Sequence, residues 1–153
     1  MGRPGLRLLG RLIMEGLAAR VLTPPIVRWV ALLGLCAAYL QGGINKALDF
    51  GGAVAELAHF GMPPLPALAA AVIALELGAS LLILAGRLRW LGALALAGFT
   101  LFATFVANRY WTMAGPERAM TANAFYEHLG LVGGFLLVAW HDLKSQHPSP
   151  SAS

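Results

Sequence analysis

The chain has 153 residues and a net charge of +4; 58% of its residues are hydrophobic and only 12% are charged, and its mean hydropathy is +0.70. A soluble domain typically carries about twice this fraction of charged residues, so the composition predicts one integral membrane domain. The arginines are scattered rather than gathered in a basic run with aromatics, which excludes a nucleic-acid-binding surface. The single cysteine, Cys36, excludes an intrachain disulfide, a CxxC redox pair and a cysteine-based metal site.

The first 22 residues form a distinct N-terminal segment. Arg3, Arg7, Arg11 and Glu15 recur every four residues and therefore share one face of a helix, with leucines mostly on the other. This pattern predicts an amphipathic helix that lies on an anionic membrane surface. Three alternatives stay open: a secretory signal, whose apolar run these arginines would interrupt, a transit peptide, and a true start at Met14.

Four apolar stretches follow, each about as long as the roughly 20 residues that cross a bilayer. They run from Ile26 to Leu48, Leu65 to Ala85, Trp90 to Ala107 and Ala122 to Trp140. The fourth has to carry Glu127 and His128 into the membrane, because the uncharged stretch after His128 is too short to cross alone. The sequence therefore predicts an all-α, four-helix transmembrane bundle over residues 23–143, after the interfacial helix of residues 1–22 and before a disordered Pro- and Ser-rich tail, 144–153.

The connections differ in character. Asp49 to Pro64 is rich in glycine and proline and is predicted to be a loop, and so is the polar stretch from Asn108 to Thr121. Gly86 to Arg89 is a tight turn, which makes the second and third spans an antiparallel hairpin. Eight lysines and arginines lie on one side of the predicted spans and three on the other, so both termini are expected to be cytoplasmic.

Polar side chains gather between the midplane and the outer face of the predicted bundle. At about 1.5 Å per residue from the inner ends, Glu76 lies roughly 16 Å up, Gln41 and His128 roughly 20 Å, and Lys46 roughly 27 Å. A carboxylate inside a bilayer normally faces protein or a water-filled cavity and has a partner. The sequence predicts an outward-opening polar pocket whose candidate residues are Glu76, His128, Gln41, Lys46, Arg109, Asn45, Thr100, Thr104, Trp111 and Glu127.

Within this pocket, Glu76 is expected to bond Gln41, His128 or a threonine of the third span, while Lys46 and Arg109 close the mouth. Simpler interpretations stay open for every candidate. Lysine and arginine can extend to the headgroups, Trp111 can anchor the interface, and the threonines can bond their own helix backbone. His128 can be a helix-packing residue, and Glu76 can be purely structural.

The chain resembles the DoxX family of small four-span membrane proteins over roughly residues 27–144. The segments that carry this resemblance are GGINKALDF (42–50), GMP (61–63), ELGASLLILAGRLRWLGALAL (76–96), FTLFATFVANRYW (99–111) and FYEHLGLVGGFLL (125–137). The resemblance implies a multi-pass protein of the bacterial inner (plasma) membrane. The family includes a subunit of thiosulfate:quinone oxidoreductase, so the resemblance also implies an association with membrane redox systems and quinone. The family's polar positions are Lys46, Glu76, Arg109 and His128 here.

Three functions compete at this stage. The first is an accessory subunit of a quinone-linked redox system, which needs an external quinone or a partner subunit because the chain has no thiol pair. The second is a non-catalytic assembly or structural subunit whose polar layer locks four helices together. The third is a small-solute or proton pathway. A homo-oligomer is compatible with each, and whether the protein is an enzyme stays open.

The charge asymmetry makes a testable prediction about topology. A reporter fused after Ser153 should behave as cytoplasmic and one inserted near Gly52 as external, because the basic ends of the spans are retained on the cytoplasmic side. Paired alkaline phosphatase and fluorescent-protein fusions measure this, and the reverse pattern contradicts the predicted orientation.

Overall fold

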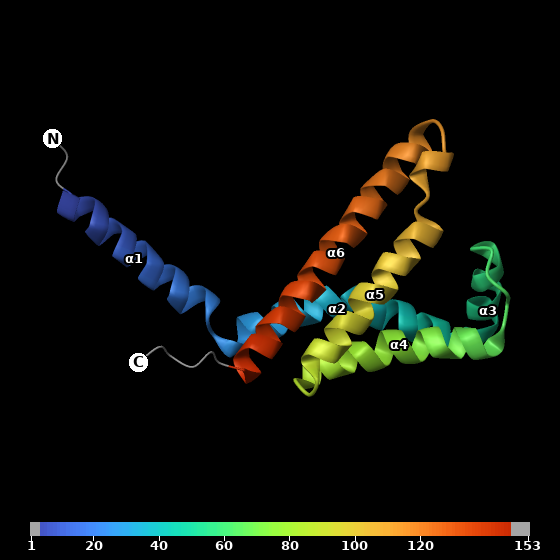
Figure 1. Cartoon of the computed structure of the whole chain (residues 1–153), viewed down its shortest axis with the longest axis horizontal. Helices are drawn as coiled ribbons and strands as arrows, with labels where there is room; N and C mark the ends of the chain where they lie inside the picture. The colour runs from blue at the N-terminus through green and yellow to red at the C-terminus, as the bar shows by residue number, and fades with distance from the viewer. Residues whose placement is uncertain (1–3, 148–153) are drawn as a thin grey trace. The chain divides into compact units, whose positions relative to one another are not determined.

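The computed structural model describes residues 4–147, with side chains from residue 10 onward, and most of this part is helical (Figure 1). The helices are α1 (Pro4–Leu22), α2 (Pro25–Leu48), α3 (Phe50–His59), α4 (Pro66–Ala85), α5 (Arg89–Ala107), the short 3-10 helix η1 (Tyr110–Thr112) and α6 (Pro116–Gln146). In the described part, four helical segments are long and apolar enough to cross a membrane: α2, α4, α5 with η1, and α6. The all-α, four-span fold predicted from the sequence is confirmed.

The chain forms two compact units, residues 1–34 and 35–153. The first contains α1 and the beginning of α2. The Thr23 hydroxyl donates to the carbonyl of Ala19 at the end of α1, and α2 then begins at Pro25, where a missing N–H costs nothing. Arg11 and Glu15 form an exposed ion pair at 2.8 Å, a kind of contact that adds little stability. The placement of α1 on a membrane surface stays a prediction, and Arg3 lies outside the described residues.

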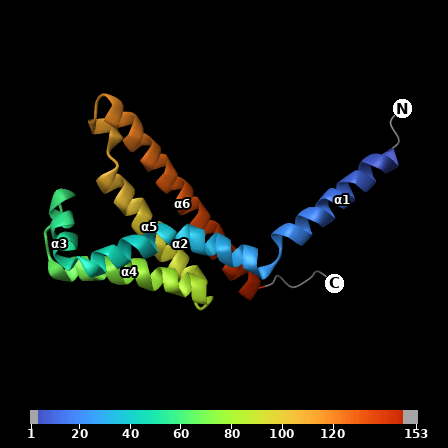
Figure 2. The ribbon, with the colours of Figure 1, turned by 180° about the vertical axis from the view of Figure 1, so that it is seen from behind.

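The second unit is built on the α4–α5 hairpin, whose helices leave the turn in diverging directions (Figure 2). Gly86 ends α4 in the left-handed conformation, with a φ of 76°, and Leu88 follows with a φ of 50°. Glycine adopts this conformation without strain, whereas leucine needs support from its surroundings. The Arg89 Nε–H supplies part of that support, because it donates to the carbonyl of Ile83 at 2.9 Å in the last turn of α4.

A carboxylate from α6 holds the other side of this turn. Asp142 is buried, and its Oδ2 accepts the backbone N–H of Trp90 at 3.1 Å in the first turn of α5. The Arg89 guanidinium lies 3.8 Å from the other carboxylate oxygen, and Gln146 donates to Oδ2 at 3.0 Å. The negative charge at the amino end of α5 also complements the helix dipole. One side chain of α6 thus takes the place of a local N-cap for α5.

The structure corrects the predicted loop between the first two spans. Residues Phe50–His59 form helix α3, whose N-cap is Asp49: its carboxylate accepts the N–H of Gly52 at 2.9 Å. Ala53 and Leu57 of this helix pack with Ala69 of α4 in a small buried cluster. A carboxylate N-cap stabilises a helix start by about 1 kcal/mol, and together with this packing it outweighs the low helix propensity of the two glycines.

The predicted loop before the last span is also shorter than expected. The 3-10 helix η1 occupies part of it, and α6 begins at Pro116 rather than near Ala122. Gly115 precedes it with a φ of 71°, and proline suits the first helical turn. At its other end α6 continues through Lys144 to Gln146, and the tail residues 148–153 lie outside the described residues.

Gly92 of α5 packs directly against α4, and this close contact makes a prediction. A Cβ added at Gly92 would lie 2.6 Å from the carbonyl oxygen of Ala79 and 3.1 Å from the Cβ of Leu82. Gly92→Ala should therefore lower the free energy of unfolding by about 1–3 kcal/mol, as overpacking does. The matched control is Gly98→Ala on the same helix, where nothing lies within 4 Å.

Unfolding both variants in mixed detergent micelles provides the measurement. Gly98→Ala should be neutral or slightly stabilising, because alanine has the higher helix propensity. Equal stabilities for the two variants would show that α4 and α5 are not in close contact at Gly92.

Candidate functional site: a cavity beside a buried ion pair

Glu76 accepts a direct, two-pronged contact from Lys46. The lysine Nζ lies 3.0 Å from Oε1 and 3.2 Å from Oε2 of the carboxylate. Glu76 is only 5% exposed, and the Lys46 side chain is 22% exposed. The expectation that Glu76 bonds Gln41, His128 or a threonine first, with Lys46 only at the mouth, is therefore wrong. Lys46 is the side chain that pairs with the Glu76 carboxylate.

Two glycines allow this contact to form. A Cβ at Gly43 would lie 2.8 Å from the Leu77 side chain and 3.4 Å from the Glu76 Cβ, so α2 and α4 approach closely here. A Cβ at Gly42 would lie 3.5 Å from the Lys46 Nζ. Gly43 lets α2 and α4 approach each other. Gly42 leaves space for the Lys46 ammonium group, which lies against the surface of its own helix.

A second polar contact joins α2 to α5. The hydroxyls of Tyr39 and Thr100 form a buried hydrogen bond, and Thr100 also donates to its own helix at the carbonyl of Leu96, 2.6 Å away. With that hydrogen committed, the Thr100 oxygen accepts from Tyr39. The Tyr39 ring packs edge-on against Phe135 of α6 at a centroid distance of 5.4 Å. Thr100 therefore bonds its own helix backbone, as the simpler interpretation expects, and also links α5 to α2.

His128 of α6 is half-buried and bonds mainly within its own helix. Its Nδ1 lies 2.6 Å from the carbonyl oxygen of Ala124. Because a carbonyl only accepts, this bond places the hydrogen on Nδ1 and makes Nε2 the acceptor of the neutral ring. Asn108 of the α5 end lies 3.3 Å from the same Nδ1 and donates to the Thr104 hydroxyl at 3.2 Å.

A cavity of about 500 Å³ lies against these groups. Among the predicted site residues, its lining includes Lys46, Glu76, Thr100 and His128. The remaining wall is mostly apolar and comes from all five α-helices of the second unit, with Phe60, Phe99, Phe102, Leu75, Val106 and Leu131 among its members. Cavities of this size hold a drug-sized molecule, fixed by a few polar groups on an apolar wall.

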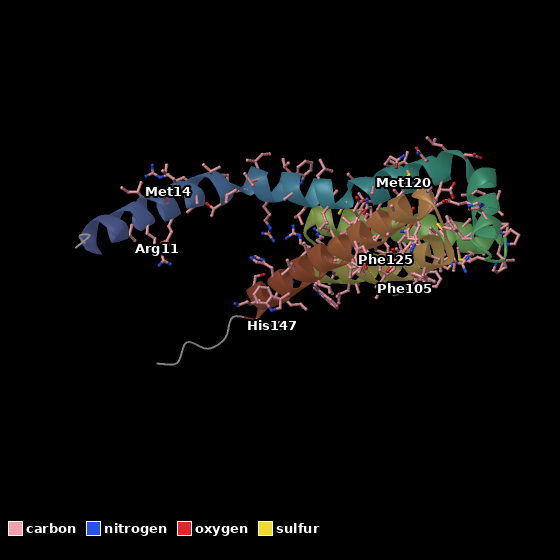
Figure 3. The ribbon with its side chains drawn as sticks, turned by 90° about the horizontal axis from the view of Figure 1, so that it is seen from above. Arg11, Met14, Phe105, Met120, Phe125 and His147 are labelled. Carbon is pink, nitrogen blue, oxygen red and sulfur yellow. The ribbon has the colours of Figure 1, made fainter. Side chains whose placement is uncertain are left out.

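Six predicted site residues lie outside this lining: Gln41, Asn45, Arg109, Thr104, Trp111 and Glu127. Gln41, Asn45, Arg109 and Glu127 are exposed, and Thr104 is fully buried beside Asn108. Trp111 is 49% exposed. It belongs to an aromatic cluster with Phe105, Tyr110, Phe125 and Tyr126 at the η1 end of the unit, where Phe105 and Phe125 meet edge-on at 5.4 Å (Figure 3).

The sequence reasoning missed Glu56, which lies on α3 and lines the cavity. The available signal was Asp49, an N-cap residue placed directly before an apolar-periodic stretch. Tyr39, the partner of Thr100, also lines the cavity and is not among the predicted site residues. Within the described residues, no three His, Cys, Asp or Glu side chains lie together in a way that could hold a metal ion.

These features define a class: an integral membrane protein of four spans, with an ion pair buried beside a cavity between its helices. The DoxX family profile matches residues 27–109, more than half of the chain, and the chain belongs to the DoxX family. It is similar to the inner membrane protein YphA of Escherichia coli (strain K12), with 28% identity over 116 residues, which cover 75% of this chain and 82% of that protein. No solved structure matches the chain.

The ion pair makes an asymmetric prediction about stability. Lys46→Met should lower the free energy of unfolding by about 2–4 kcal/mol, because it leaves a buried carboxylate without a partner. Glu76→Leu should cost less, because the freed lysine can extend to the aqueous side. The double variant Lys46→Met/Glu76→Leu should cost less than the sum of the two, because no unpaired charge stays in the interior.

The measurement is a double-mutant cycle in mixed micelles, with Glu127→Leu as the control for losing an exposed carboxylate. This control should change stability by no more than about 0.5 kcal/mol. Additive effects of the two single variants would contradict the idea that Lys46 and Glu76 stabilise the fold as a pair.

Proposed function

We propose that this protein binds a quinone in the cavity and serves as an accessory subunit of a quinone-linked redox system. The observation that carries the proposal is the cavity itself: about 500 Å³, mostly apolar, with Lys46, Glu76 and His128 among its lining residues. A quinone ring is flat and apolar and carries two carbonyl oxygens. An apolar wall with a small number of placed donors matches that chemistry.

Lys46, Glu76 and His128 each have a separate role in the proposed binding of the quinone. Lys46 has three hydrogens, of which two are directed at Glu76, so one can be donated to a quinone carbonyl. The Glu76 carboxylate and the Nε2 of His128 can accept protons from a quinol, as general bases do. The electrons are exchanged with a redox partner subunit, and this chain supplies the binding site and the proton acceptors.

The same proposal gives the protein its place in the cell. Its relative YphA is named as an inner membrane protein, and we propose the bacterial inner membrane for this chain as well, with both termini cytoplasmic. Three of the basic residues that favour this orientation, Arg87, Arg89 and Lys144, lie at the ends of α4, α5 and α6 that are not joined to α3. The cavity then lies in the outer half of the bilayer.

A structural role is the second candidate, and a different observation favours it. Among the described residues, every buried side-chain nitrogen or oxygen has a hydrogen-bond partner. A polar layer whose groups are all satisfied can hold four helices together without any ligand. In that case the protein is a non-catalytic assembly subunit, and the cavity stays empty of quinone.

Filling the cavity distinguishes the two candidates. Leu131→Trp adds bulk at a lining residue and leaves every polar group in place, and Leu129→Trp adds the same bulk two residues away, outside the lining. The wild type in lipid nanodiscs should bind decylubiquinone in calorimetric titrations. Leu131→Trp should weaken binding by about tenfold or more, a loss of about 1.4 kcal/mol, and Leu129→Trp should not.

Thermal unfolding of each variant shows whether the fold is intact. A wild type that binds no quinone, or a Leu131→Trp protein that binds it as well as the wild type, contradicts the proposal. The first outcome favours the assembly subunit.

A further inference from the structure

The cavity reaches the surface within the membrane-spanning part of two helices. Phe102 of α5 lines it and is 58% exposed, and Ala71 of α4 lines it and is exposed as well. Ala71 lies five residues after the start of α4, and Phe102 five residues before the end of α5. At 1.5 Å per residue, both lie about 7–8 Å inside the ends of their helices. This rim is therefore at the depth of the lipid tails.

The divergence of α4 from α5 explains why the rim exists. The two helices are packed tightly near their common turn, where Gly92 approaches Ala79, and they separate toward the other end (Figure 1). Beyond the point of separation, Leu75 of α4 and Phe99 and Val106 of α5 line the cavity. Apolar side chains of both helices thus line the cavity where α4 and α5 diverge.

The charged side chains of the lining come from α2, α3 and α4, and none comes from α5. Lys46 and Glu76 belong to the contact between α2 and α4, and Glu56 comes from α3. A ligand that fits all of this has a polar head at the ion pair and an apolar part toward the α4–α5 gap. The volume sets a further limit, because about 500 Å³ holds a ring and a few carbons but not a long hydrocarbon tail.

We infer that the cavity opens laterally into the bilayer between α4 and α5, and that it takes a membrane-dissolved amphiphile whose tail leaves between Ala71 and Phe102. The nature of the head, a quinone ring, rests on the proposed function, whereas the lateral opening does not. A tail that stays among the lipid chains keeps its apolar surface out of water throughout binding. The tail length, rather than the ring alone, then contributes to selection of the ligand.

Two ligands with the same head and different tails test the tail route. Ala71→Trp places bulk on the rim, and Ala74→Trp places it at an exposed position of the same helix outside the lining. In nanodiscs, Ala71→Trp should weaken binding of a ubiquinone with ten isoprenoid-chain carbons by about tenfold or more. Binding of a ubiquinone without an isoprenoid tail should change by less than about threefold, and Ala74→Trp should affect neither. If Ala71→Trp weakens the binding of both ligands equally, or weakens neither, the proposed route for the tail is wrong.

A second measurement tests the opening without any quinone. In a Cys36→Ala background, a bimane label on Ala71→Cys reports what surrounds the rim, and a label on Met113→Cys, at an exposed position between η1 and α6, is the control. Lipids brominated on the tails should quench the first label strongly and the second weakly, and aqueous iodide should quench the second label but not the first. Quenching of the Ala71→Cys label by iodide rather than by brominated lipid places the opening in water and overturns the inference. If the label behaves as expected but no quinone binds, the lateral opening stands and the proposed head chemistry fails.

Discussion

The pairing of Lys46 with Glu76 is the polar contact that joins α2 to α4 in the second unit. A carboxylate in an apolar interior is tolerated only when a cation or several donors lie against it. The cation here comes from another helix, so satisfying Glu76 also fixes α2 against α4 at the depth of Gly42 and Gly43. The same contact supplies the polar side of the cavity. One electrostatic requirement therefore determines both how the helices meet and where a ligand could find a donor.

The two ends of the second unit differ in how closely the helices are packed. Near the α4–α5 turn there is no room for a side chain at Gly92 beside the Ala79 carbonyl, and Arg89 and Asp142 bond a carbonyl of α4 and an N–H of α5. Toward α3 and η1 the helices separate, and aromatic and aliphatic side chains line the space between them. The packing of α4 against α5 near their turn fixes the direction in which the two helices diverge. The space between their other ends is therefore maintained.

The sequence was sufficient to predict the spans and to select Glu76, since length, apolarity and a buried charge are properties of the chain alone. It was not sufficient to predict the partner of Glu76. Counting the rise per residue gives a depth along the helix, but it gives neither the rotation of the helix nor the reach of a lysine stem. Gln41 has a suitable depth and is exposed, whereas Lys46 seemed too high and makes the contact.

Helix α4 shows why the rotation was hard to predict. It is apolar on nearly every face apart from Glu76 and Ser80, so there is no polar stripe from which to infer which side faces protein. Helix α3 was missed for a different reason: its glycines suggested a loop, and its stability depends on a cap and on Ala69, a residue distant in sequence. Local composition cannot show that contact, whereas Asp49 is a helix N-cap signal that the sequence itself contains.

The use of Asp142 as the cap of α5 has a consequence for how the protein is made. A ribosome delivers the hairpin of α4 and α5 before it delivers the last turns of α6, so the N–H of Trp90 has no carboxylate partner at first. Burying such a group in lipid without a partner is costly. Water at the interface can occupy that N–H until Asp142 is made, so the last turns of α6 complete the cap of a helix that was made before them.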